Sequence, residues 1–206
     1  MNIHKILAKL DEFYPDCDKC YLNYEKPYEL LIATMLSAQC TDDRVNMVTA
    51  TLFQNYQSLE AFATAKLVDM EQAVKSTGFY RNKAKHIIAA SQLLLSRHGG
   101  VLPSDIEGLT ALPGVGRKTA NVVRCHIFGI PSVVVDTHVG RISRRLGIAT
   151  STDPVKVEFE LMTALPQAHW IRYNHQLIAF GRAICKAPRP KCRDCFMTEL
   201  CPSCIT

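Results

Sequence analysis

Apolar residues recur at helical spacing along most of the chain, and almost no segment alternates as β-strands do. Residues 28–37 are apolar nearly all round and predict a buried helix, while Val45, Val48, Leu52 and Phe53 mark one face of the next helix. The run VVVDTH could form a strand, but one short isolated strand cannot form a sheet. The pattern therefore predicts an all-α protein.

The same spacing predicts further helices. Residues 58–77 should be helical as far as Gly78. The others have recognisable start or end signals: a helix through residues 84–95 capped at 98–100, a short helix after Ser104, a helix from Arg117, a helix behind Asp153-Pro154 with Val155, Phe159 and Met162 on one face, and residues 168–182.

The composition bounds the class of protein. With 206 residues, 48% of them apolar, the chain can bury one or two ordinary cores. The N-terminus lacks the features of a signal peptide, and no apolar run is long enough to span a membrane. We therefore expect a cytoplasmic protein with no membrane partner. In a reducing compartment, its nine cysteines favour metal binding, catalysis or burial over disulfides.

The C-terminal tail has the spacing Cys185-x6-Cys192-x2-Cys195-x5-Cys201. Four thiolates so close in sequence can converge on zinc or on an iron–sulfur cluster. Spacing alone does not separate these, although the long first interval favours a cluster. Cys204 is an alternative fourth ligand.

Positive charges predict a nucleic-acid partner. The chain carries a formal charge of +5, and Lys186, Arg189 and Lys191 lie on a short proline-containing loop between the first two tail cysteines. Such a basic surface suits phosphate backbones. Further cations cluster elsewhere: Arg81, Lys83 and Lys85; Arg117, Lys118 and Arg124; Arg141, Arg144 and Arg145.

The segment LTALPGVGRKTANVVRCHIF predicts a helix-hairpin-helix. Gly114 and Gly116 flank Val115 in the turn, and a new helix begins at Arg117. Glycines can adopt positive φ and let the N–H groups that open the second helix approach an anion. In a basic protein this anion is most simply a DNA phosphate, whose contacts position the protein without reading sequence.

Lys118 and Asp136 are the candidate catalytic pair. Lys118 falls in the first turn of the second hairpin helix, where the macrodipole disfavours a positive charge, and its primary amine is a candidate nucleophile. A phosphate-binding lysine is the alternative. Asp136 ends an apolar run and is placed to cap a helix starting at Thr137.

LPGVGRKTANVV, VDTH, LSAQCTDDRVN and the cysteine tail together resemble the endonuclease III family of base-excision DNA glycosylases, over almost the full chain. The resemblance implies two helical lobes flanking a DNA-binding cleft. A six-helix barrel with the hairpin would span residues 21–131, and residues 1–20 with 132–206 would form the lobe that holds a [4Fe-4S] cluster on Cys185, Cys192, Cys195 and Cys201.

The resemblance also implies the chemistry. Lys118 would attack the sugar C1′ of a flipped, oxidised pyrimidine nucleotide in duplex DNA, Asp136 would assist, and a Schiff base with β-elimination would cut the strand 3′ to the abasic site. Gln39 matches the residue that fills the gap left by the flipped base. Phe79 takes the wedge position, where the family commonly has leucine. We expect a nucleoid-associated monomer that binds duplexes with damaged bases or abasic sites.

Other functions stay open at this stage. A pyrimidine-dimer-specific glycosylase/lyase of the same family would share these motifs. The adenine-specific branch typically lacks the lysine found here at Lys118. A non-catalytic, metal-stabilised DNA-binding module would need neither this amine nor the carboxylate of Asp136.

Overall fold

The computed structural model describes residues 2–17 and 20–205, and within these ranges all regular secondary structure is helical. Two compact units form, one from residues 20–130 and the other from the N-terminal segment with residues 131–206. The boundaries expected from the sequence fall one residue later at each junction. No helix in the described part of the chain is long and apolar enough to cross a membrane.

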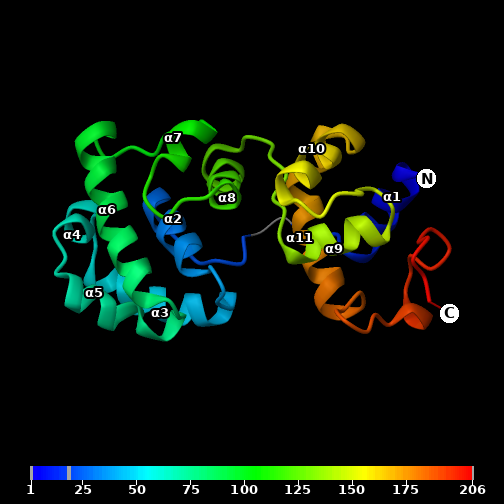
Figure 1. Cartoon of the computed structure of the whole chain (residues 1–206), viewed down its shortest axis with the longest axis horizontal. Helices are drawn as coiled ribbons and strands as arrows, with labels where there is room; N and C mark the ends of the chain where they lie inside the picture. Colours follow the sequence, from blue (N-terminus) through cyan, green and yellow to red (C-terminus); the bar gives the residue numbers. More distant parts are fainter. Residues whose placement is uncertain (1, 18–19, 206) are drawn as a thin grey trace. The chain divides into compact units, whose positions relative to one another are not determined.

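The unit of residues 20–130 is built around α2, which contacts α3, α6 and α8 (Figure 1). Every residue from Glu29 to Leu36 is buried, as the uniformly apolar sequence predicts. The helices of this unit are α2 (Pro27–Leu36), α3 (Asp42–Asn55), α4 (Leu59–Ala63), α5 (Leu67–Val74), the 3₁₀-helix η1 (Lys75–Thr77), α6 (Tyr80–His98), α7 (Ile106–Thr110) and α8 (Arg117–Phe128).

The prediction of a continuous helix over residues 58–77 is wrong, because the helix is interrupted between α4 and α5. The hydroxyl of Thr64 donates to the carbonyl of Glu60 at 2.8 Å. The side chain of Gln92 on α6 donates to the carbonyl of Ala63 at 2.9 Å. These two bonds satisfy carbonyls at the end of α4, so the helix can stop there without leaving them unpaired.

The second unit joins both ends of the chain. Its helix α1 packs against α11, and α9 packs against the same helix (Figure 1). Phe13 of α1 stacks on Phe196 of the cysteine tail with ring centroids 4.1 Å apart, which anchors the tail to the N-terminal helix. The helices are α1 (Ile3–Phe13), α9 (Thr137–Arg145), α10 (Pro154–Ala164), η2 (Gln167–His169), α11 (Trp170–Ala183) and η3 (Cys192–Asp194).

Helix α10 begins as predicted, with Asp153 as its N-cap and Pro154 in its first turn. Its buried face differs from the predicted one, however. Val157 and Leu161 are fully buried, whereas Val155 and Phe159 are 41% and 52% exposed. The predicted pair and the buried pair both have helical spacing, so the sequence pattern does not show which of the two faces is buried.

Candidate active site and cysteine pocket

The segment predicted as a helix-hairpin-helix folds as α7, a tight turn and α8. The N-cap of α7 is Asp105, one residue after Ser104, and its carboxylate accepts from the N–H of Gly108 at 2.6 Å. Gly114 has φ of +77°, and a Cβ there would lie 2.7 Å from the side chain of His86. The hairpin therefore requires glycine at position 114 for both conformation and space.

The conformation of Gly116 differs from the expectation, and Val115 has a structural contact. Gly116 has φ of −91°, so it needs no positive φ, and a Cβ built on it would meet nothing within 4 Å. The side chain of Val115 is buried and its N–H donates to the carbonyl of Leu112 at 3.1 Å. Val115 thus holds the hairpin together, and an anion would meet the N–H groups that follow it.

No side chain caps the N-terminus of α8. The first-turn N–H groups of a helix have no intrahelical acceptor, and together with the macrodipole they form an anion-binding end. Lys118 is exposed in this turn, directly after the half-buried Arg117. An accessible primary amine therefore lies beside a backbone site that suits a phosphate.

Asp136 caps α9 as the sequence predicts. Its carboxylate accepts from the N–H of Val139 at 2.8 Å, and the residue is only half-buried. His138, in the first turn, faces Arg141 with 3.2 Å between its Nδ1 and the guanidinium. Burial lowers the pKa of His138, Asp136 opposes this shift, and Arg141 and Arg182 reinforce it. The helix cap thus fixes the carboxylate while leaving part of it open to solvent.

Gln39 and Phe79 share an unusual backbone conformation. In the described part of the chain they are the non-glycine residues with positive φ, at 55° and 49°. A positive φ strains the backbone of a bulky residue. Residues with such strain are found mostly at functional sites. Gln39 is exposed and Phe79 is 65% exposed, so neither side chain belongs to the core of its unit.

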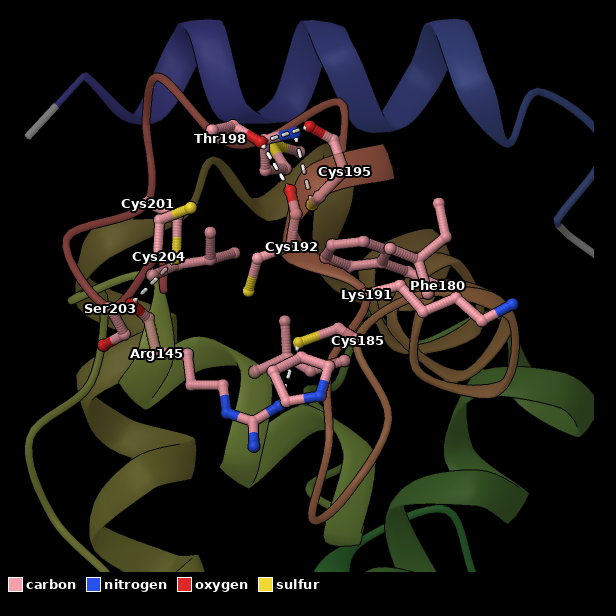
Figure 2. Close-up of a pocket in the computed structure, with 15 residues that line it drawn as sticks. Arg145, Phe180, Cys185, Lys191, Cys192, Cys195, Thr198, Cys201, Ser203 and Cys204 are labelled. Atoms are coloured by element: carbon pink, nitrogen blue, oxygen red, sulfur yellow. Dashed lines mark hydrogen bonds between the residues drawn. The ribbon is translucent and has the colours of Figure 1, made fainter. Parts of the chain in front are cut away.

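The cysteine tail folds around one pocket (Figure 2). All five cysteines of the tail line it, together with apolar side chains from α9 and α11 and with Met197, which is fully buried. The hydroxyl of Thr198 donates to the carbonyls of Cys192 and Cys195 at 3.0 and 2.6 Å. The loop is therefore held by hydrogen bonds from the side chain of Thr198 to its backbone and by packing on the core of its unit.

Two arginines of α9 that the sequence placed on a DNA-facing surface hold this loop instead. Arg145 donates to the Sγ of Cys185 at 3.2 Å and to the carbonyl of Lys186 at 3.0 Å. Arg141 donates to the carbonyl of Cys185 at 2.9 Å. Their spacing of four residues shows that both side chains lie on one face of the helix. It does not show what they bind, because their partners lie about forty residues away in sequence.

The pocket offers donors for a metal centre, because thiolates are ligands of both zinc and iron–sulfur clusters. Within residues 2–17 and 20–205, no three histidine, cysteine or acidic side chains, as they stand, are close enough together to hold one metal ion. The N–H of Met197 donates to the Sγ of Cys195 at 3.4 Å, a bond of the kind that tunes cluster sulfurs.

The thiols of this pocket are in surroundings that disfavour bare thiolates. Burial raises the pKa of Cys195 and Cys201, and the sulfurs of neighbouring cysteines reinforce the rise. A bound metal cation would offset both effects. The other cysteines lie elsewhere: Cys125 is buried, while Cys17, Cys20 and Cys40 are half-buried. Cys40 packs at the edge of the core of its unit.

The predicted basic surface divides into two groups. Lys186, Arg189 and Lys191 are all exposed, as a DNA-binding loop requires. Lys83, expected on the surface, is instead buried with 6% exposure. Arg124 and Arg144 donate to backbone carbonyls of their own units, so these cations serve the fold as well.

Comparison with known proteins agrees with this geometry. Residues 32–167 match the HhH-GPD superfamily of base excision DNA repair proteins. The endonuclease III of Synechocystis is 48% identical to this chain, and the match covers 97% of this chain and 91% of the relative. The endonuclease III of Bacillus subtilis is 47% identical, and the match covers 98% of this chain and 93% of the relative.

A solved structure described as a trapped endonuclease III–DNA covalent intermediate matches with a TM-score of 0.92 at 43% identity. The match covers 98% of this chain and 94% of the chain in the solved structure. A thermostable thymine-DNA glycosylase, at 22% identity and a TM-score of 0.85, shares the fold. The all-helical fold, the hairpin and the identity over nearly the full length show that this chain belongs to the endonuclease III family of base excision DNA repair proteins.

Proposed function

We propose that this DNA glycosylase and AP lyase removes oxidised pyrimidines from duplex DNA and then cleaves the strand 3′ to the abasic site. The observation that carries the proposal is the exposed amine of Lys118 in the uncapped first turn of α8. This turn can hold a DNA phosphate while the amine reaches the adjoining sugar. The family membership of the chain supports the glycosylase and lyase activities.

The chemistry assigned to Lys118 is nucleophilic catalysis. The Nζ lone pair forms a bond to C1′ as the bond from C1′ to the base nitrogen breaks, and the base leaves with a proton. Loss of a proton from Nζ and opening of the sugar ring give an iminium. Removal of a C2′ proton then expels the 3′ phosphate, and water releases the lysine.

The other site residues have supporting roles in the proposal. Asp136 assists the attack and stabilises the positive charge that develops on the sugar. Gln39 fills the space left by the flipped base, and Phe79 unstacks the neighbouring base pair. The exposure of both side chains supports these assignments.

We also propose that Cys185, Cys192, Cys195 and Cys201 hold a [4Fe-4S] cluster. The cluster would order the loop that carries Lys186, Arg189 and Lys191, so that these exposed cations can contact phosphates. Cys204 lines the same pocket, where burial and the neighbouring Cys192 raise the pKa of its thiol. It is therefore the natural control for the choice of fourth ligand.

Replacing Cys201 with serine is expected to lower the iron and sulfide content of the purified protein severely, because a hydroxyl is a poor ligand for this cluster. The Cys204→Ser variant is expected to retain the wild-type content. Iron and acid-labile sulfide per chain, together with the visible absorbance, give the measurement. Loss of iron in Cys204→Ser with retention in Cys201→Ser would transfer the ligand role to Cys204.

The proposed substrate is tested with duplexes that carry thymine glycol, a pyrimidine dimer or an abasic site, with borohydride present to trap covalent complexes. We expect base release and trapping with thymine glycol, and trapping with the abasic site. Release at the dimer alone would assign the chain to the dimer-specific branch. Absence of release and trapping on every duplex would contradict the proposed function.

A further inference from the structure

Lys83 is a buried cation for which the proposed chemistry has no use. It lies in the first turn of α6, where the helix dipole disfavours a positive charge, and it is 6% exposed. Burial lowers its pKa from the ordinary value of a lysine. A side chain placed against both preferences is expected to have a specific structural partner.

The partners of Lys83 are two backbone carbonyls from different elements. Its Nζ donates at 2.8 Å to the carbonyl of Leu36, the last residue of α2, and at 2.8 Å to the carbonyl of Thr77, the last residue of η1. The two oxygens are therefore no farther apart than twice this distance. An ammonium has three N–H groups and a neutral amine has two, so either form can serve both carbonyls.

The two elements lead directly into the strained residues of this unit. Gln39 follows Leu36 by three positions, and Phe79 follows Thr77 by two. Both residues have positive φ and exposed side chains. Strained backbone persists only where the surroundings fix it, and the amine of Lys83 is shared by the segments before both residues.

We propose that Lys83 is a positioning residue that ties the Gln39 loop and the Phe79 loop together, so that their side chains enter the DNA stack at a fixed separation. The inference rests on the proposed function, because it presumes a duplex that must be unstacked. It assigns Lys83 no contact with DNA, since its side chain is buried within the unit.

Lys83→Met keeps the apolar stem and removes the donors. Lys66→Met is the matched control, because it makes the same change at an exposed lysine of the same unit that lies outside the predicted basic clusters. Two single-turnover rates are measured for each full-length variant. One is base release from the preferred damaged duplex, and the other is strand cleavage at an abasic site in single-stranded DNA, where no base pair has to be opened.

For Lys83→Met we expect the duplex rate to fall by about tenfold or more, because hydrogen bonds from a charged group are lost. The single-strand rate should stay within about twofold of wild type, as should both rates of Lys66→Met. The ratio of the two rates is independent of how much protein folds. Lys83→Gln, which retains an amide donor, should give a ratio between those of Lys83→Met and wild type.

An unchanged ratio in Lys83→Met, whether both rates fall together or neither falls, would overturn the inference. A ratio that falls equally in Lys66→Met would overturn it too, because loss of charge alone would then explain the effect. Failure of the proposed function looks different, since the wild-type protein itself would then release no base and form no trapped complex.

Discussion

Replacing Lys118 with glutamine is expected to abolish borohydride trapping to abasic DNA. Only a primary amine can form the iminium that borohydride reduces, and the amide of glutamine is not nucleophilic. Lys118 is exposed in the first turn of α8, so the substitution should leave the fold and the binding of DNA largely intact. Denaturing gels detect the trapped complex, and gel shifts at fixed salt measure binding.

Lys66→Gln is the control for this experiment, because it removes an exposed lysine from the same unit that lies outside the predicted basic clusters. It should trap as the wild-type protein does. Trapping at the wild-type level by Lys118→Gln would exclude this amine as the nucleophile and would return Lys118 to the role of a phosphate-binding residue.

Replacing Asp136 with asparagine is expected to slow base release by about a hundredfold or more, the range in which a positioned acid or base contributes. Asparagine caps helices about as well as aspartate, so the bond to the N–H of Val139 should survive the substitution. The free energy of unfolding should therefore change little, and so should DNA binding. Single-turnover excision, thermal unfolding and gel shifts are measured together.

Asp136→Ala separates the two roles of this side chain. It removes both the charge and the cap, and loss of an N-cap costs about 1 kcal/mol of stability. Alanine should thus match asparagine in catalysis but be less stable. If asparagine reduced DNA binding as much as catalysis, Asp136 would be a structural residue of α9 and nothing more.

Local motifs carried much of the sequence-based account. The hairpin, the cap formed by Asp136 and the gathering of the tail cysteines each depend on residues close together in the chain, whose spacing constrains their geometry. The reading of Gly116 failed in one respect, because motif composition does not show which of two glycines takes the positive φ.

Long-range contacts account for what the sequence did not show. In the sequence, Lys83 has the character of a solvent-exposed cation. In the fold it donates to the carbonyl of Leu36, which lies forty-seven residues earlier in the chain. Arg145 likewise belongs to a predicted DNA-facing cluster in the sequence. In the fold it donates to the Sγ of Cys185. In both cases the partner is a distant group that no helical periodicity indicates.

The central claim is that the amine of Lys118 becomes covalently attached to the deoxyribose of the damaged nucleotide. Peptide mapping by mass spectrometry of the reduced complex formed by the wild-type protein tests this claim most directly. The account predicts that the sugar remnant is found on the peptide that contains Lys118. A remnant on any other lysine or on the N-terminal amine would contradict it.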